Sequence, residues 1–198
     1  GWYFKMVSDD ERQRWAIIPG IFLGENGHAF IQDLNGNSAQ SRYFRYSLSE
    51  FWASRDEFDI KIGQNQFSSR QISLDIDDSH GNISGTVQFE GTTPWPVSLI
   101  SPGIMGWYAW VPRMECYHGV LSLDHSLRGT LQIDGEAVDF TNGRGYIEKD
   151  WGQTFPQAYI WFQGNHFATK GTSVSASVAI IPWLGNAFRG FIIGFWHQ

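Results

Sequence analysis

Hydrophobic and polar residues alternate along much of this chain with a period of two. Residues 71–77 place three aliphatic side chains on one side and four polar ones on the other, and residues 82–90 repeat the alternation. Successive side chains of a β-strand point to opposite faces, so both segments are predicted strands. The polar residues 77–81 between them are typical of a turn, and the pair is predicted to form a hairpin.

The same alternation recurs in at least nine segments and predicts an all-β protein. Residues 127–135 would turn Leu131 and Ile133 inward, and residues 173–181 separate Val174, Ala176, Val178 and Ile180 from three serines. The 22 glycines and seven prolines fall mostly between such segments, as hairpin turns and bulges require. Many antiparallel strands avoid exposed edges by closing, so we expect an antiparallel, lipocalin-like or calycin-like β-barrel.

One segment departs from the strand pattern. In residues 47–58, Ser47 and Glu50 have the spacing of a capping box at the start of a helix. The segment is short and aromatic, so a short helix and an extended segment both remain open.

Two stretches resemble each other and indicate an internal repeat. Residues 14–32 and 177–193 share Ile-Ile-Pro, Leu-Gly and Phe-Ile in the same order, and each follows an aromatic strand and a polar turn. We therefore expect a first β-barrel lobe over residues 1–142, a joint over 143–158, and the start of a second, incomplete lobe over 159–198.

Composition limits the classes of function. The chain is 42% hydrophobic and 16% aromatic. Its formal charge of −6 argues against electrostatic binding to nucleic acid or to an anionic bilayer. One cysteine permits no internal disulfide, and no uncharged apolar run is long enough for a transmembrane helix. We expect a cytoplasmic protein whose natural start lies upstream of Gly1, so that any signal segment is not visible.

The most unusual motif is Gly-Tyr-Ile-Glu-Lys-Asp-Trp-Gly, residues 145–152. In a strand, Glu148 and Asp150 share one face about 6.5–7 Å apart, with Lys149 on the other. If that face is enclosed, proximity of like charges and desolvation would let one carboxyl group hold a proton and deliver it. The alternatives are ion pairs with arginines such as Arg113, Arg128 or Arg144, and simple exposure to solvent.

A second polar motif lies at residues 112–125 and contains Cys116, His118 and His125. The spacing matches no zinc pattern and lacks an evident fourth ligand, so no metal site is predicted. Either histidine could line a pocket as an acid or a base, and Cys116 is expected to be a small buried side chain. Aromatic residues bracket both motifs, as core or as the wall of an apolar pocket; they include Tyr146, Trp107, Trp110, Trp151 and Trp161.

Residues 112–167, together with 1–7 and 177–185, resemble the tocopherol cyclase family. The resemblance centres on GYIEKDWG followed by FP, YIW, Q and NHF, and it covers nearly the whole chain. It implies a two-lobed, lipocalin-like β-barrel related to carotenoid hydratases. Family members are longer than 198 residues, so the resemblance also implies a chain truncated in its second lobe.

The resemblance further implies an intramolecular lyase that protonates the alkene of a prenylated benzoquinol and lets the phenol oxygen capture the cation, with no redox cofactor or metal. We expect Asp150 or Glu148 as the acid, His118 or His125 as the proton acceptor, and Tyr146, Trp151 and Trp161, with Trp107 and Trp110, as ligand-binding walls. Peripheral contact with a membrane is expected for a protein that acts on a prenyl lipid. Two alternatives stay open: a lipocalin-like carrier of an apolar prenyl lipid, and a structural module in which the motif is only a clamp.

Overall fold

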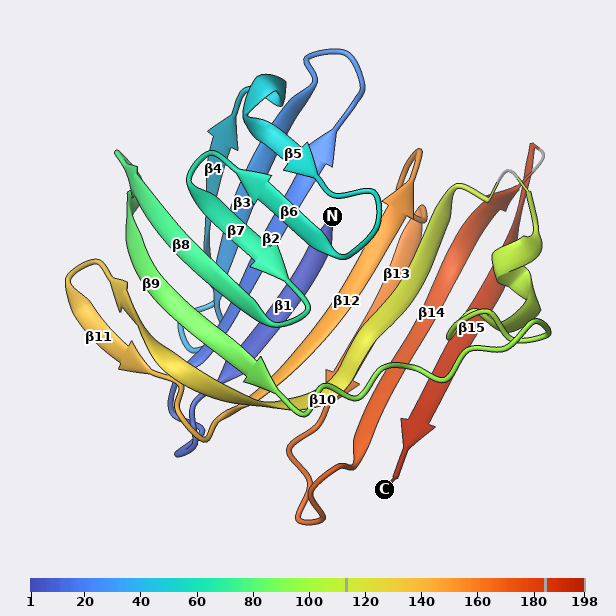
Figure 1. Cartoon of the computed structure of the whole chain (residues 1–198). Coiled ribbons are helices and arrows are strands. Elements are labelled where there is room, and N and C mark those ends of the chain that lie inside the picture. The colour runs from blue at the N-terminus through green and yellow to red at the C-terminus, as the bar shows by residue number, and fades with distance from the viewer. Residues whose placement is uncertain (113, 184, 198) are drawn as a thin grey trace. The chain divides into compact units, whose positions relative to one another are not determined.

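The computed structural model describes residues 1–112, 114–183 and 185–197 (Figure 1). Its regular elements are strands and two short 3₁₀ helices, which confirms the all-β class. The elements are β1 (Trp2–Val7), β2 (Arg14–Phe22), β3 (His28–Asn35), β4 (Gln40–Tyr46), η1 (Leu48–Glu50), β5 (Phe51–Ala53), β6 (Asp59–Ile62), β7 (Asn65–Ser68), β8 (Gln71–Asp78), β9 (Gly81–Glu90), η2 (Gly106–Trp110), β10 (Cys116–Ile133), β11 (Glu136–Asp139), β12 (Arg144–Gly152), β13 (Ala158–Gly164), β14 (Ser173–Trp183) and β15 (Asn186–Trp196).

The chain packs as two compact units that are interleaved along the sequence. Unit 1 consists of Gly1–Thr92 and His125–Tyr146, and unit 2 consists of Thr93–Asp124 and Ile147–Gln198. The long strands β10 and β12 contribute residues to both units. The expected division into residues 1–142, 143–158 and 159–198 stays a prediction.

Unit 1 is built on an antiparallel sheet whose strands follow the order β4-β3-β2-β1-β12-β10-β9-β8-β7-β6-β5. The predicted hairpin is β8–β9, with Ile72 paired to Val87 and both side chains buried. The sheet curls over its own apolar face (Figure 1). Phe4 of β1 therefore stacks on Phe89 of β9, with ring centroids 5.9 Å apart, and meets Phe67 of β7 at 5.8 Å.

The expected closed barrel is not formed. The sheet is a path with β4 and β5 as its ends, and among the described residues no ladder of backbone hydrogen bonds joins them. Side-chain ion pairs instead connect β4 to other parts of the sheet. Arg42 of β4 binds the buried Asp33 and reaches Asp134 at 2.7 Å in the turn between β10 and β11. The all-β class predicted from the alternation is thus confirmed, whereas the prediction of a closed barrel is wrong.

The segment with capping-box spacing forms only one turn of 3₁₀ helix. The Ser47 backbone N–H donates to Glu50 Oε2 at 2.8 Å, which confirms the cap at the start of η1. The chain then enters β5, which pairs with β6. Pairing with a neighbouring strand therefore overrides helix propagation after one turn.

Unit 2 contains a second sheet of three antiparallel strands, β13-β14-β15. One face of this sheet carries Ser173, Ser175 and Ala179, which are all buried. Trp95 and Ile104, from the segment before η2, lie on this face against Gly194 of β15. The opposite face carries the apolar side chains of the alternation and is open to solvent, the reverse of the usual burial preference.

The internal repeat corresponds to a repeated local structure. In unit 1, β1 pairs with β2 and β2 with β3, all antiparallel. In unit 2, β13, β14 and β15 form the same three-stranded succession. The two Ile-Ile-Pro stretches lie in β2 and β14, the middle strand of each set.

Candidate functional site: a histidine between two carboxylates

Strands β10 and β12 are neighbours in the sheet, and their segments in unit 2 carry the polar motifs. His118 belongs to β10, and Glu148 and Asp150 belong to β12. Because alternate residues of a strand share a face, Glu148 and Asp150 point to the same side, where they meet His118. Two residues that are two positions apart in the motif and one that lies about 30 positions earlier thus form a single cluster.

The imidazole of His118 lies between the two carboxylates. Its Nδ1 is 2.8 Å from Asp150 Oδ1, which is a hydrogen bond, and its Nε2 is 3.7 Å from Glu148 Oε2. The second distance is too long for a direct hydrogen bond, but one hydroxyl group placed between the two atoms could contact both. The side chains of His118 and Glu148 are 13% and 6% exposed, so the contacts are largely shielded from water.

The two carboxylates stabilise the protonated, positively charged form of the His118 imidazole. Burial alone would lower the pKa of His118, but the hydrogen bond to Asp150 and the negative charges of Glu148 and Asp150 raise it above its usual 6.5. His118 is therefore an imidazolium below pH 6.5, with its Nδ1–H donated to Asp150.

The same three side chains have the chemistry of a metal site. One ligand atom from each of His118, Glu148 and Asp150 lies within 4.8 Å of the others. Such oxygen and nitrogen donors suit divalent cations in general. The structure therefore brings together a set that can hold either protons or a cation, and this set differs from the cysteine–histidine combination considered from the sequence.

The glycines around the motif mark close approaches of the backbone. A side chain at Gly152 would collide with the Glu115 backbone, and one at Gly145 would collide with the ring of His125. The Gln153 N–H donates to the Glu115 carbonyl at 2.8 Å, which ties the end of β12 to the start of β10. The absence of side chains at these positions allows the two strands to lie close enough for the cluster to form.

His125, the other predicted histidine, belongs to unit 1 and is not part of the cluster. It is 3% exposed and packs on Phe89 with ring centroids 4.7 Å apart. Burial, with a smaller effect of the charge on Lys5, lowers the pKa of His125 to about 3. His125 is therefore a neutral core side chain at physiological pH.

The remaining polar residues near the motif are less reactive or lie elsewhere. Burial and the charge of Asp150 raise the pKa of Cys116 to about 11, so the thiol stays protonated. Arg128, an expected ion-pair partner of the motif, lies 4.0 Å from Glu90, and Arg113 lies outside the described residues. Among the contacts described here, the group that lies between the two carboxylates is His118, which is a cation when protonated.

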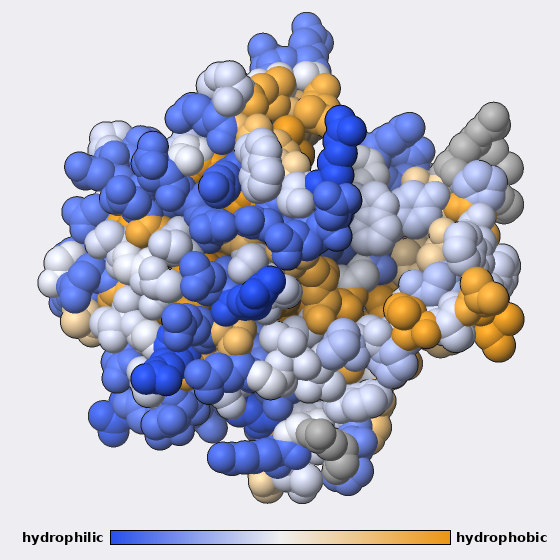
Figure 2. Space-filling model, in the orientation of Figure 1, coloured by the Kyte–Doolittle hydropathy of each residue, from blue (hydrophilic) through white to orange (hydrophobic). Residues whose placement is uncertain are grey.

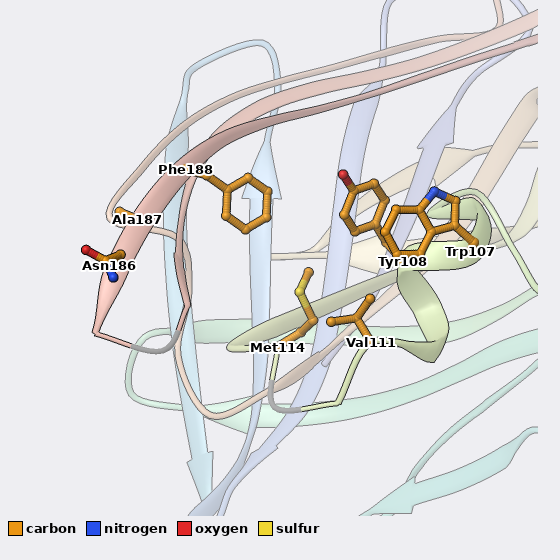
Figure 3. Close-up of a pocket in the computed structure, with 7 residues that line it drawn as sticks. All are labelled: Trp107, Tyr108, Val111, Met114, Asn186, Ala187 and Phe188. Atoms are coloured by element: carbon orange, nitrogen blue, oxygen red, sulfur yellow. The ribbon is translucent and has the colours of Figure 1, made fainter.

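A pocket of about 570 Å³ lies in unit 2 beside η2 (Figure 3). Figure 3 shows Phe188 of β15 facing Tyr108, with Trp107 beside Tyr108 on the side away from Phe188, and Met114 and Val111 below. Pockets of 300–1,000 Å³ with apolar walls are typical of sites for small molecules. Asn186 and Ala187 complete the lining, so the wall is almost entirely apolar.

Two hydrogen bonds connect this pocket to the strand that carries His118. The His118 backbone N–H donates to the sulfur of Met105, the residue before η2, at 3.1 Å. The Tyr117 hydroxyl donates to the carbonyl of Val111, a lining residue, at 2.9 Å. Tyr117 and His118 are thus held by the residues that precede and follow η2.

The aromatic residues predicted to form the walls of one ligand pocket do not lie together in the structure. Trp107 lines the pocket, whereas Trp110 is 64% exposed and donates its indole N–H to the Leu99 carbonyl. Trp151 stacks on Tyr117 with centroids 5.6 Å apart. Tyr146 is fully buried in unit 1, and Trp161 is half-buried on β13.

Five pocket residues were not singled out from the sequence: Val111, Met114, Asn186, Ala187 and Phe188. Phe188 is about 80 residues from Tyr108, and only the strand order of unit 2 brings them together. The available signal was the internal repeat, which predicts a strand at Phe188 but not what that strand faces.

The fold and the site together define an all-β protein that has a shielded histidine–carboxylate cluster next to an apolar pocket. Residues 89–189 match the family described as tocopherol cyclase-like, and the chain belongs to this family. It is 34% identical to a protein named tocopherol cyclase, chloroplastic, from Zea mays, in an alignment that covers 90% of this chain and 48% of that protein.

It is 32% identical to a protein named probable tocopherol cyclase, chloroplastic, from Oryza sativa subsp. japonica, with 90% of this chain and 49% of that protein covered. The chain thus spans about half the length of these curated relatives. No solved structure matches it. No helix in the described part of the chain is long and apolar enough to cross a membrane.

Proposed function

We propose that this protein is an intramolecular lyase that cyclises a prenylated benzoquinol-type lipid to a chromanol. The observation that carries the proposal is the shielded cluster in which His118 lies between Asp150 and Glu148, in a chain of the tocopherol cyclase-like family. Cyclisation by this route needs a proton donor, an acceptor for the phenolic proton and an apolar cavity, and unit 2 contains groups of each kind.

In this proposal Glu148 is the catalytic acid. Asp150 accepts the Nδ1–H of His118, whereas Glu148 is the more buried carboxyl group and is proposed to carry the proton that is transferred. Burial disfavours the charged form of a carboxyl group, which suits Glu148 to hold a proton before the reaction. His118 acts through Glu148 as a positioning residue that stabilises the carboxylate left after proton transfer.

The proposed reaction conserves every atom. Glu148 donates its proton to the trisubstituted alkene, and a tertiary cation forms. The phenol oxygen then bonds to that carbon, and its proton returns to Glu148. Substrate and product have the same mass, and the acid is restored after each turnover. Shielding from water protects the cation from capture by solvent.

The apolar pocket next to η2 is proposed to hold the prenyl chain. Its walls include Trp107, Tyr108 and Phe188, and aromatic faces attract cations that are out of water. The proposed location is cytoplasmic, with peripheral contact to a membrane from which a prenyl lipid would be drawn.

The test is turnover of a dimethylphytylbenzoquinol, followed by chromatography for a chromanol of unchanged mass. We expect Glu148→Gln to lower the rate at least about 100-fold, the lower range for loss of a general acid. Glu115→Gln, the same change in the same unit outside the cluster, is the matched control and should retain the rate.

Equal rates for Glu148→Gln and Glu115→Gln would remove the acid assignment. Binding of the quinol by the unsubstituted protein without any turnover would support a carrier of the apolar ligand instead.

A further inference from the structure

The cluster of His118, Glu148 and Asp150 contains a gap that a metal ion fits. The imidazole Nε2 of His118 lies 3.7 Å from Glu148 Oε2, which is too long for a hydrogen bond. Zinc bonds to imidazole nitrogen and carboxylate oxygen are about 2.0–2.2 Å long, so two ligand atoms of one ion lie at most about 4 Å apart. The two atoms are therefore within the distance that one zinc ion spans, without a large movement of either side chain.

The third residue of the cluster holds His118 in the orientation that a metal ligand needs. Asp150 Oδ1 lies 2.8 Å from the Nδ1 of His118, and the Nδ1–H donates to this carboxylate. In the neutral imidazole, Nε2 is then the unprotonated nitrogen, and it is the nitrogen that lies near Glu148. A metal-bound histidine almost always donates its other N–H to such a partner, and loss of the partner weakens metal binding about 10–100-fold.

Two paired strands keep the three side chains in place. Tyr117 of β10 stacks on Trp151 of β12 with ring centroids 5.6 Å apart, so the chain neighbours of two cluster residues are packed together. Just beyond the ends of these strands, the Gln153 N–H donates to the Glu115 carbonyl at 2.8 Å. Ligands on such rigid elements are already close to the geometry of the bound state, which favours binding.

The site is shielded but can be reached from solvent. The side chains of His118 and Glu148 are 13% and 6% exposed, whereas that of Asp150 is 29% exposed. An ion can therefore enter past Asp150. Once inside, it is attracted to the carboxylates more strongly than at the surface, because there is little water to screen the charges.

The donor atoms favour zinc over magnesium or calcium. Imidazole nitrogen suits zinc and other late first-row ions, whereas magnesium and calcium prefer oxygen ligands. One ligand atom from each of the three residues lies within 4.8 Å of the others, so the set offers one nitrogen and two oxygens. Zinc accepts such mixed donors and can keep water on its remaining positions.

We propose that His118 and Glu148 bind a zinc ion, that Asp150 orients His118 for it, and that the bound ion inhibits the site. The inhibition rests on the proposed function. The ion takes the gap between Nε2 and Glu148 Oε2, and its binding releases to solvent the proton that Glu148 is proposed to carry. The same gap is the place for a hydroxyl group of the quinol, so zinc excludes both the substrate hydroxyl and the transferred proton.

Binding is tested without any quinol. The protein is stripped with a chelator, dialysed and titrated with zinc chloride in a calorimeter. We expect His118→Gln and Glu148→Gln each to lower the affinity at least about 100-fold, because a direct ligand is lost, and Asp150→Asn to lower it about 10–100-fold. Magnesium and calcium should bind at least about 100-fold more weakly than zinc. Cobalt(II) in place of zinc should give visible absorption bands that His118→Gln lacks.

Surface groups provide the background and the control. Hydrophilic residues cover much of the face shown in Figure 2, so weak binding of cations at the surface is expected. His80 and Asp78 form an exposed pair there or elsewhere on the surface, with 64% and 44% of their side chains accessible. His80→Gln should therefore leave the tight site unchanged. Zinc should raise the midpoint of thermal unfolding of His80→Gln but not that of His118→Gln, because only a bound ion stabilises the folded state.

Zinc that binds no more tightly than magnesium would overturn the proposal, and so would unchanged zinc affinity in His118→Gln. Inhibition is measured as turnover of the dimethylphytylbenzoquinol at saturating zinc and again after excess chelator, and we expect loss followed by recovery. Turnover that persists with zinc bound would reject the inhibition.

The ion site and the proposed function fail separately. Zinc binding that depends on His118 and Glu148, in a protein that never turns over the quinol, would keep the site and reject the cyclase. Turnover by a protein that binds no zinc would keep the cyclase and reject the site.

Discussion

Replacing His118 by glutamine should destabilise the protein most strongly near pH 6. The imidazolium lies 2.8 Å from the Asp150 carboxylate, a pair worth about 6 kcal/mol at an effective dielectric constant of about 20, and 3.7 Å from Glu148. Desolvation offsets much of this attraction, so removal of the cation from the buried cluster should cost about 3 kcal/mol in the free energy of unfolding.

The pH dependence follows from the raised pKa of His118. Because the folded-state pKa lies above the unfolded value of 6.5, the stabilisation is fully present below pH 6.5 and is lost as the pH rises through the folded-state value. The difference between the unsubstituted protein and His118→Gln should therefore narrow above neutral pH.

The assay is urea denaturation at a series of pH values from about 6 to about 9. His80→Gln is the control, because His80 and its partner Asp78 form an exposed pair worth at most about 1 kcal/mol. Equal stability of His118→Gln and the unsubstituted protein near pH 6, or an NMR titration that places the pKa of His118 below 6.5, would refute the reasoning.

Three further predictions concern packing, thiol chemistry and the pocket. Gly145→Ala should lower the free energy of unfolding by about 1–3 kcal/mol, because the added methyl group meets the His125 ring. Gly164→Ala should lower it less, because a methyl group there has neighbours only at ordinary contact distances. Thermal unfolding of both variants tests this prediction. Cys116 should react with a disulfide reagent at pH 8 at least about 100-fold more slowly in the folded than in the urea-unfolded protein, because its pKa is about 11. Phe188→Ala should weaken binding of the prenylated quinol about tenfold with a smaller effect on kcat, as steady-state kinetics would show.

The period-two alternation was sufficient to predict the strands of unit 1 and the grouping of Glu148 with Asp150. Both depend on local geometry, since a strand fixes the side to which each residue points. Their meeting with His118 depends on the pairing order of β10 and β12, which the sequence does not specify. Either histidine was therefore a possible partner until the structure placed His125 in the core of unit 1.

The sheet of unit 2 shows the limit of the same rule. Alternation correctly separates Val178 from Ser175 and Ser177, but it does not say which side is covered. The covered face is determined by the segment before η2, which places Trp95 and Ile104 against β15. Closure of the sheet in unit 1 was likewise not predictable, because it depends on whether β4 and β5 meet after ten intervening pairings.

The most direct test of the central claim, that the cluster delivers a proton to carbon, is cyclisation in heavy water. Glu148 and the quinol hydroxyls exchange with solvent, so each chromanol molecule should gain one deuterium at a carbon position, visible as a mass increase of about one unit that survives washing in ordinary water. Glu115→Gln should give the same labelled product, and Glu148→Gln should give almost none. Unlabelled chromanol from the unsubstituted protein, or labelled chromanol formed at an equal rate by Glu148→Gln, would contradict the account.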